Sequence, residues 1–204
     1  MSLDGFVAGH GQSVENPLGI GGTRLHEWVF PLQVWRAMHD MPGGEVNASS
    51  PVVEESLANI GATVMGRNMF GGHPGPWRQD APWNGWWGNN PPFHHPVFVL
   101  THHVRAPLAL DGGTTFTFVT EGINAALAHA RSAAAGRDVA LAGGAHTAAQ
   151  YLAAGLVDEM EISLVPTLLG AGERPFDGVD DLQGLELVRT VATPQVTHLK
   201  FARR

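Results

Sequence analysis

The chain has 204 residues, no cysteine and a formal net charge of -7 at pH 7. A chain of this length buries roughly 70% of its unfolded surface, so we expect one large domain with a sizeable core. The absence of cysteine excludes disulfides, zinc thiolates and a cysteine nucleophile. The acidic balance argues against nucleic acid as a partner.

The sequence also has no recognisable membrane or secretion segment. No apolar run reaches the ~18 residues of a membrane span. The N-terminus lacks a basic region followed by an apolar one, which is the pattern of a signal peptide. We therefore expect a cytoplasmic protein without a membrane partner.

The first fifty residues are predicted to be loop with short helical turns. Gly9–Gly22 is rich in glycine, and Leu25–Met41 is apolar but interrupted by Pro31. Ser50 and Pro51 then fit the N-cap and the first position of a better helix.

A strand followed by an arginine comes next. Ala62–Met65 is a short apolar run, and Gly66 and Arg67 follow it directly. The guanidinium of Arg67 suits a phosphate, because it presents several donors in a planar fork. An ordinary surface arginine is the alternative.

The segment Gly71–Pro96 has no helical or strand period but contains Trp77, Trp83, Trp86 and Trp87. A long loop inside a compact domain is usually functional or disordered, and four tryptophans argue against disorder. Two interpretations stay open. The loop either walls an aromatic substrate, or forms a self-packed flap or a dimer contact.

Two more strands are predicted at Val97–Thr101 and Thr115–Val119, and a helix at Gly122–Ala135. The polar residues from His102 to Arg105 follow the first of these strands. Open α/β sheets bind ligands at the carboxyl ends of their strands, so this segment is a candidate binding site.

Residues 138–155, DVALAGGAHTAAQYLAAG, predict a strand, a double glycine and a helix in succession. Glycines let the backbone turn sharply and approach a ligand, and the first N–H groups of a helix attract anions. Gly143 and Gly144 are therefore either the seat of a diphosphate or cofactor ring, or a plain tight turn. Both interpretations stay open, because two glycines are a weaker signal than GxGxxG.

The C-terminal region predicts three strands, at Glu159–Val165, Leu185–Val191 and Val196–Phe201. No helical segment separates them, so we expect antiparallel strands that close the sheet. With the preceding βα units, this order predicts a mixed, mostly parallel sheet with helices on both faces.

Four segments together resemble the dihydrofolate reductase-like superfamily, and within it the branch named for the reductase domain of bacterial riboflavin biosynthesis. They are SLDGFVAG at Ser2–Gly9, VMGRNMF at Val64–Phe70, VFVLTHH at Val97–His103 and VALAGGAHTAAQYLAAGLVDEMEISLVPTLLGAGERPF at Val139–Phe176. Their order and spacing match the family over nearly the whole chain. Family members usually have a strand before SLDG, whereas this sequence begins at Met1. Two explanations stay open, a misassigned start or a shortened chain, and on the second we expect part of the central sheet to be missing.

The resemblance implies an α/β, dihydrofolate reductase-like three-layer fold. We expect a mixed, mostly parallel central sheet with helices on both faces and antiparallel C-terminal strands. A single domain of this type would span residues 1–204, with loop insertions near residues 10–50 and 71–96.

The resemblance also implies NADPH as cofactor, bound along the carboxyl edge of the sheet. Its phosphate and adenosine contacts map to Arg67, Asn68, Thr101, His102, His103 and Arg105. Its diphosphate and nicotinamide contacts map to Gly143, Gly144, Ala145, His146 and Thr147. The border of the nicotinamide and the substrate maps to Asp4, Gly5 and Phe6.

The proton donor has two candidates, Asp4 and Glu54. A carboxyl group needs a raised pKa to donate a proton at neutral pH. The alternatives are a loop turn for Asp4 and a charge at the start of a helix for Glu54.

These observations favour an NADPH-dependent reductase that transfers a hydride to a small, heteroaromatic or carbonyl-like substrate. The resemblance makes it similar to 5-amino-6-(5-phosphoribosylamino)uracil reductase and dihydrofolate reductase. We expect a homodimer that pairs through sheet edges, with Glu159–Val165 and Val196–Phe201 as the pairing strands.

Two other hypotheses remain. The chain is alternatively a non-catalytic dimeric NADP(H)-binding module, because no residue is indispensable for catalysis. A metal site could use the eleven histidines. However, His94 and His95, like His102 and His103, are adjacent, and two ligands on one helix face need i, i+4 spacing. We therefore expect no metal.

Overall fold

The computed structural model describes all residues from Met1 to Arg204, and the chain forms two compact units. One unit contains residues 59–148, and the other contains residues 1–58 and 149–204. A single domain over residues 1–204 stays a prediction. None of the helices combines the length and the apolar character that a membrane span requires.

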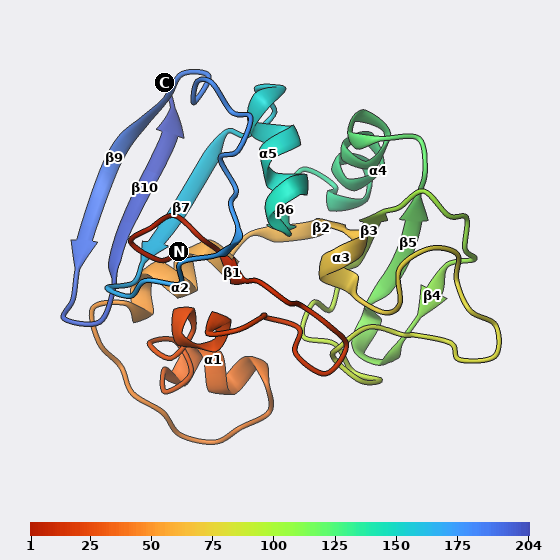
Figure 1. Ribbon diagram of the computed structural model, residues 1–204, viewed down its shortest axis with the longest axis horizontal. Coiled ribbons are helices and arrows are strands. Elements are labelled where there is room, and N and C mark those ends of the chain that lie inside the picture. Colours follow the sequence, from red (N-terminus) through yellow and green to blue (C-terminus); the bar gives the residue numbers. More distant parts are fainter. The chain divides into compact units, whose positions relative to one another are not determined.

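The unit of residues 59–148 contains a five-stranded sheet that is parallel except for one edge strand (Figure 1). Its strands, in spatial order, are β4 (Leu108–Ala109), β5 (Thr115–Val119), β3 (Pro96–Leu100), β2 (Ile60–Gly66) and β6 (Asp138–Gly143). The short 3-10 helix η2 (Asp111–Gly113) connects β4 to β5. The four predicted strands of this region are therefore confirmed, as expected for short apolar runs that are buried in a parallel sheet.

Different elements pack on the two faces of this sheet. Side chains alternate along a strand: on β3, Phe98 stacks on His129 of α4 (Ile123–Ala134), with ring centroids 6.1 Å apart. Val97 and Val99 belong to a buried aromatic cluster instead. Several tryptophans of the 71–95 loop pack on that cluster. In this unit α4 therefore covers one face, and the short helix α3 (Arg67–Phe70) together with the loop covers the other, since Phe70 belongs to the same cluster.

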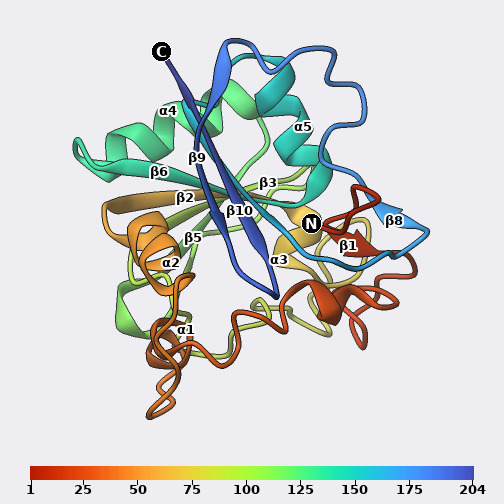
Figure 2. The ribbon, with the colours of Figure 1, turned by 90° about the vertical axis from the view of Figure 1, so that its left-hand side faces the viewer.

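The other unit contains three antiparallel strands that pair with one another (Figure 2). They are β7 (Glu159–Leu164), β10 (Thr197–Arg203) and β9 (Leu185–Ala192), with β10 in the middle. The antiparallel prediction is confirmed, but the strands form a sheet of their own. Because β10 is paired on both sides, residues 196–201 offer no free edge for a dimer, whereas the outer edge of β9 is free. The outer edge of β7 is bonded to Met1 at Ser163, so only its first part is free.

The remaining elements of this unit are short. They are β1 (Ala8–Gly9), which pairs with β8 (Gly172–Glu173), and the helices η1 (Gly22–Leu25), α1 (Gln33–Met38) and α2 (Ser50–Leu57). The helix at Ser50 is confirmed, although its N-cap is Ser49 and no side chain caps it.

A buried histidine explains why Ser49 does not cap α2. His198 on β10 is 1% exposed. Its Nε2 lies 2.9 Å from the Ser49 hydroxyl, and its Nδ1 lies 3.0 Å from the Ser163 hydroxyl. The edge of the ring meets Trp28, with centroids 4.9 Å apart. Burial, and then the charge of Arg189, lower the pKa of His198 below its ordinary value of 6.5.

We predict that His198→Gln makes stability less dependent on pH. Below pH 6.5 the unfolded state binds a proton that the folded state resists, so folding stability is present above this pH and lost as the pH falls. The variant should lose about 1–3 kcal/mol of unfolding free energy at pH 7, because it disturbs buried hydrogen bonds. Its decline between pH 7 and pH 5 should nevertheless be shallower than in the parent. Urea denaturation across this range measures both effects, and parallel declines would contradict the prediction.

Candidate functional site

The three candidate binding segments meet at one edge of the parallel sheet. In β2, Gly66 pairs with Leu100 of β3, and Met65 pairs with Gly143 of β6. Arg67 begins the short helix α3 (Arg67–Phe70) directly after β2. Because paired parallel strands end at the same edge, the structure brings together the turns that the sequence singled out.

The backbone of the double-glycine turn is accessible to a ligand at Gly144. Gly143 has a φ of 103°, and the bond to Gly144 is a cis peptide. A Cβ at Gly144 would meet no atom within 4 Å. Helix α5 (Ala145–Ala153) begins here, and the Ala148 N–H donates to the Gly144 carbonyl. A ligand can therefore approach Gly144 closely, whereas the positive φ requires glycine at Gly143.

The turns after β2 and β6 are packed against each other. A Cβ at Gly66 would lie 2.2 Å from Thr147 Oγ1, so only glycine fits there. Ala145 and Thr147 are buried at the start of α5, whereas His146 is exposed. Ala145 and Thr147 therefore support the turn.

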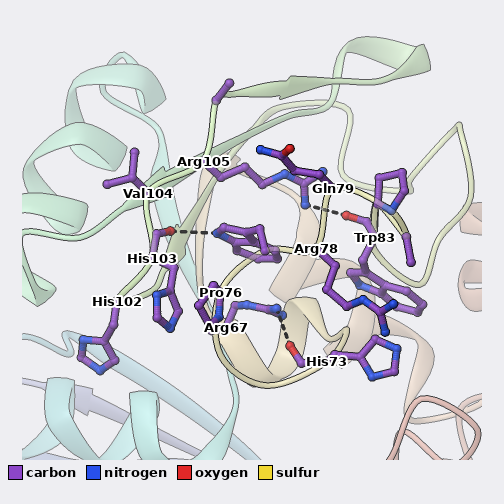
Figure 3. A pocket seen from close by; sticks show the side chains of 14 residues that line it. Arg67, His73, Pro76, Arg78, Gln79, Trp83, His102, His103, Val104 and Arg105 are labelled. Atoms are coloured by element: carbon purple, nitrogen blue, oxygen red, sulfur yellow. Dashed lines mark hydrogen bonds between the residues drawn. The ribbon is translucent and has the colours of Figure 1, made fainter.

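A cavity of about 630 Å³ lies beside Arg67, and its charged lining is entirely basic (Figure 3). Its basic side chains are Arg67, His73, Arg78, His102, His103 and Arg105. No aspartate or glutamate lines it. Arg78 is paired with Asp80, so the free guanidinium charges are those of Arg67 and Arg105. A cavity with one sign of charge favours an anionic ligand.

The two arginines share one indole ring. The guanidinium carbons of Arg67 and Arg105 lie 3.6 Å and 4.9 Å from the ring centroid of Trp77. Arg67 Nη2 donates to the His73 carbonyl over 2.8 Å, while its buried Nε has no partner. Burial, and then the charge of Arg105, lower the pKa of Arg67 to about 10. Arg67 stays protonated at neutral pH, and a bound anion would relieve the repulsion.

The loop Gly71–His95, here called the tryptophan loop, packs on α3 and also lines the cavity. The indole N–H of Trp83 donates to the Phe70 carbonyl over 2.8 Å, and that of Trp86 to the Met69 carbonyl over 2.9 Å. These bonds satisfy carbonyls at the end of α3 that have no partner within the helix. This packing agrees with the self-packed flap, and the loop supplies about half of the cavity lining as well. The substrate wall and the dimer contact stay predictions.

The predicted cofactor residues fall into two groups. Arg67, His102, His103 and Arg105 line the cavity. Thr101 is buried, and its hydroxyl accepts a hydrogen bond from the His103 N–H over 3.2 Å, so it supports the turn. Asn68 is exposed on α3 and does not line the cavity.

Asp4, in the other unit, holds a loop. Its carboxylate accepts hydrogen bonds from the N–H groups of Leu169 and Gly170, over 3.2 Å and 2.7 Å. The Ser2 hydroxyl, followed by these backbone groups, lowers the pKa of Asp4 to about 2. A carboxyl group with this pKa is ionised at neutral pH and poorly suited to donate a proton. Its surroundings favour the loop-turn alternative.

Glu54, the second candidate proton donor, is exposed on α2. The structure gives it no hydrogen bond or ion pair, whereas its neighbour Glu55 pairs with Arg189 and Lys200. Nothing in its surroundings sets it apart as an acid.

Two residues beside these sites carry no clear signal in the sequence. Trp77 is one of four tryptophans in a loop without a period. Arg174 follows β8, and its guanidinium carbon lies 4.2 Å from the centroid of Phe6, next to Gly5. It is exposed and has no hydrogen bond or ion pair, so it places a free positive charge at the predicted substrate border. In the sequence, the only sign of this role is that Arg174 belongs to the GERPF motif at the end of the fourth family-like segment.

A comparison with protein families gives one match: the model described as "RibD C-terminal domain" matches residues 1–199. No curated relative matches the sequence.

Solved structures show the same fold at low identity. A putative riboflavin biosynthesis protein from Shewanella sp. PV-4 has a TM-score of 0.59 and 20% identity, covering 100% of this chain and 95% of that one. Acinetobacter baumannii RibD has a TM-score of 0.54 and 18% identity, covering 98% and 55%.

A diaminohydroxyphosphoribosylaminopyrimidine deaminase/5-amino-6-(5-phosphoribosylamino)uracil reductase from Thermotoga maritima has a TM-score of 0.54 and 13% identity, covering 100% and 54%. The chain thus spans about half the length of the latter two proteins. These likenesses confirm the predicted fold class.

We predict that Asp4→Asn destabilises the protein at neutral pH. The folded pKa of Asp4 is about 2 against an ordinary 3.8, so its contribution is present above pH 3.8 and lost as the pH falls toward 2. The variant should therefore melt below the parent at pH 7, and the gap should narrow toward pH 2.5. Thermal unfolding at both pH values tests this, with Asp180→Asn, an exposed carboxylate, as the matched control. A gap that is independent of pH would contradict it.

Proposed function

The chain belongs to the RibD C-terminal domain family, and we propose that it is an NADPH-dependent reductase. It transfers a hydride to a small, heteroaromatic or carbonyl-like substrate. One observation supports this most. The cavity beside the carboxyl ends of β2 and β3 is lined by no carboxylate and by two arginines, Arg67 and Arg105, that form no ion pair. Such a cavity suits the 2′-phosphate of NADPH, which carries a negative charge that NADH lacks.

The proposed cofactor contacts follow the shape of the sheet edge. The 2′-phosphate is bound by Arg67, His102, His103 and Arg105. The open backbone at Gly144 and the first N–H groups of α5 bind the diphosphate, because a helix of this length presents unpaired donors and the positive end of its dipole there.

The cofactor supplies the hydride when it is bound, and the protein supplies orientation and electrostatics. Asp4, Gly5 and Phe6 border the substrate in this proposal. Asp4 acts there as an ionised anchor of the 168–170 loop, and the proton comes from water. Arg174 attracts an anionic group of the substrate, since its charge is free and exposed.

A non-catalytic NADP(H)-binding module is the alternative, because the cavity explains binding without naming a proton donor. In both cases we propose a cytoplasmic homodimer. The edge strands β9 and β7 are its pairing strands, in place of residues 196–201, and on β7 pairing is limited to the part that Met1 does not occupy.

We predict that the protein binds NADPH roughly tenfold or more tightly than NADH, because each charge-assisted hydrogen bond contributes ~1.5–3 kcal/mol. Calorimetry on the parent and on Arg105→Met tests this, and the variant should lose most of the preference. The control is Arg131→Met, which removes an arginine of α4 outside the cavity. Equal affinities in the parent would overturn the cofactor proposal. Tight binding without NADPH oxidation across a substrate panel would favour the non-catalytic module.

We predict that Gly144→Val abolishes NADPH binding and leaves the protein folded. The new side chain meets no protein atom at its Cβ, so the fold tolerates it. It fills the space through which the diphosphate would approach the backbone. Thermal unfolding paired with an NADPH titration separates the two effects. A folded variant that binds NADPH like the parent would show that the double glycine is only a structural turn.

A further inference from the structure

The cavity arginines are held by the tryptophan loop rather than by carboxylates. Arg67 donates to the His73 carbonyl over 2.8 Å, and Arg105 donates to the Trp83 carbonyl and to Asn84 Oδ1. All of these acceptors are neutral and belong to the loop. The loop thus orients both guanidinium groups without cancelling their charge.

The ring of Trp77 lies against the guanidinium groups of both arginines. Besides the two ring contacts, its indole N–H donates to the His103 carbonyl over 2.8 Å. Its ring also packs edge-on against Phe70 and Phe118, with centroids 5.8 Å and 5.0 Å apart. Trp77 is therefore fixed on several sides.

The loop itself has little freedom to move away. A Cβ at Gly71 would lie 2.3 Å from Trp86, and a Cβ at Gly72 would lie 2.9 Å from Trp83. Trp83 and Trp86 are bonded to the carbonyls of α3, so the loop is clamped to the helix that begins with Arg67.

The chemistry of an indole suits this position. Two guanidinium groups repel each other, and a neighbouring carboxylate would compensate for this but would also compete with an anionic ligand. The face of an indole attracts cations through its quadrupole and has no charge of its own. It holds the arginines close together and leaves the cavity positive.

We infer that Trp77 is a positioning residue that determines selectivity for the phosphorylated cofactor. It holds Arg67 and Arg105 toward one cavity, where they bind the 2′-phosphate together. This inference rests on the proposed function for the identity of the ligand. The experiment therefore includes adenosine 2′,5′-bisphosphate, which presents the 2′-phosphate without the nicotinamide.

The test compares Trp77→Leu, Trp77→Phe and Trp87→Leu by calorimetry with NADPH, NADH and adenosine 2′,5′-bisphosphate. Trp87 belongs to the same loop and packs on Phe93 and Phe116, but does not line the cavity. Trp77→Leu should weaken the binding of NADPH and of the bisphosphate roughly tenfold, because the 2′-phosphate of both ligands needs both arginines. It should weaken the binding of NADH less than about twofold, because NADH has no 2′-phosphate. Trp77→Phe keeps a ring and should stay near the parent, as should Trp87→Leu.

Three results would overturn the inference: Trp77→Leu binds like the parent, it weakens NADPH and NADH equally, or the parent does not bind the bisphosphate. Thermal unfolding identifies a variant that fails to fold. If Trp87→Leu does not fold, the affinities of Trp77→Leu and Trp77→Phe are compared with each other instead, and equal affinities would overturn the inference. A parent that binds the bisphosphate and NADPH but oxidises no NADPH would overturn the reductase proposal alone.

Discussion

The guanidinium groups of Arg67 and Arg105, both only partly buried, share one indole ring, and this contact constrains the unit of residues 59–148. Partial burial, and then the charge of Arg105, lower the pKa of Arg67, and no carboxylate compensates for the two charges in the cavity. The tryptophan loop stabilises them instead with carbonyls, an amide and a ring. The result is a folded unit whose cavity stays positive and favours an anion.

This arrangement links stability to binding. The tryptophan loop covers one face of the parallel sheet through the cluster around Phe70 and Phe116, and the same loop lines the cavity. Next to Arg67 in the chain, the close approach of Gly66 to Thr147 fixes the turn after β2 against the start of α5. The residues that would bind a cofactor are therefore held by packing and hydrogen bonds before a ligand arrives, which favours a pre-organised site.

Much of this is predictable from the sequence because the signals are local. Buried parallel strands appear as short apolar runs, and their carboxyl ends must meet at one edge, so the sequence alone groups Arg67, His103 and Arg105. The role of Trp77 is not predictable, because a loop without a period does not show which tryptophan turns toward an arginine. The partners of Asp4 lie about 165 residues away in the chain, and no local pattern reports such contacts. The separate antiparallel sheet escapes prediction for the same reason, since strand order depends on long-range pairing.

A crystal structure of the protein with NADPH tests the central claim most directly. The account predicts that the 2′-phosphate lies in the cavity within hydrogen-bond distance of both Arg67 and Arg105, with Trp77 still against their guanidinium groups. It also predicts that the diphosphate passes over Gly144. A cofactor bound with its 2′-phosphate away from these arginines, or with Trp77 displaced from them, would contradict the account.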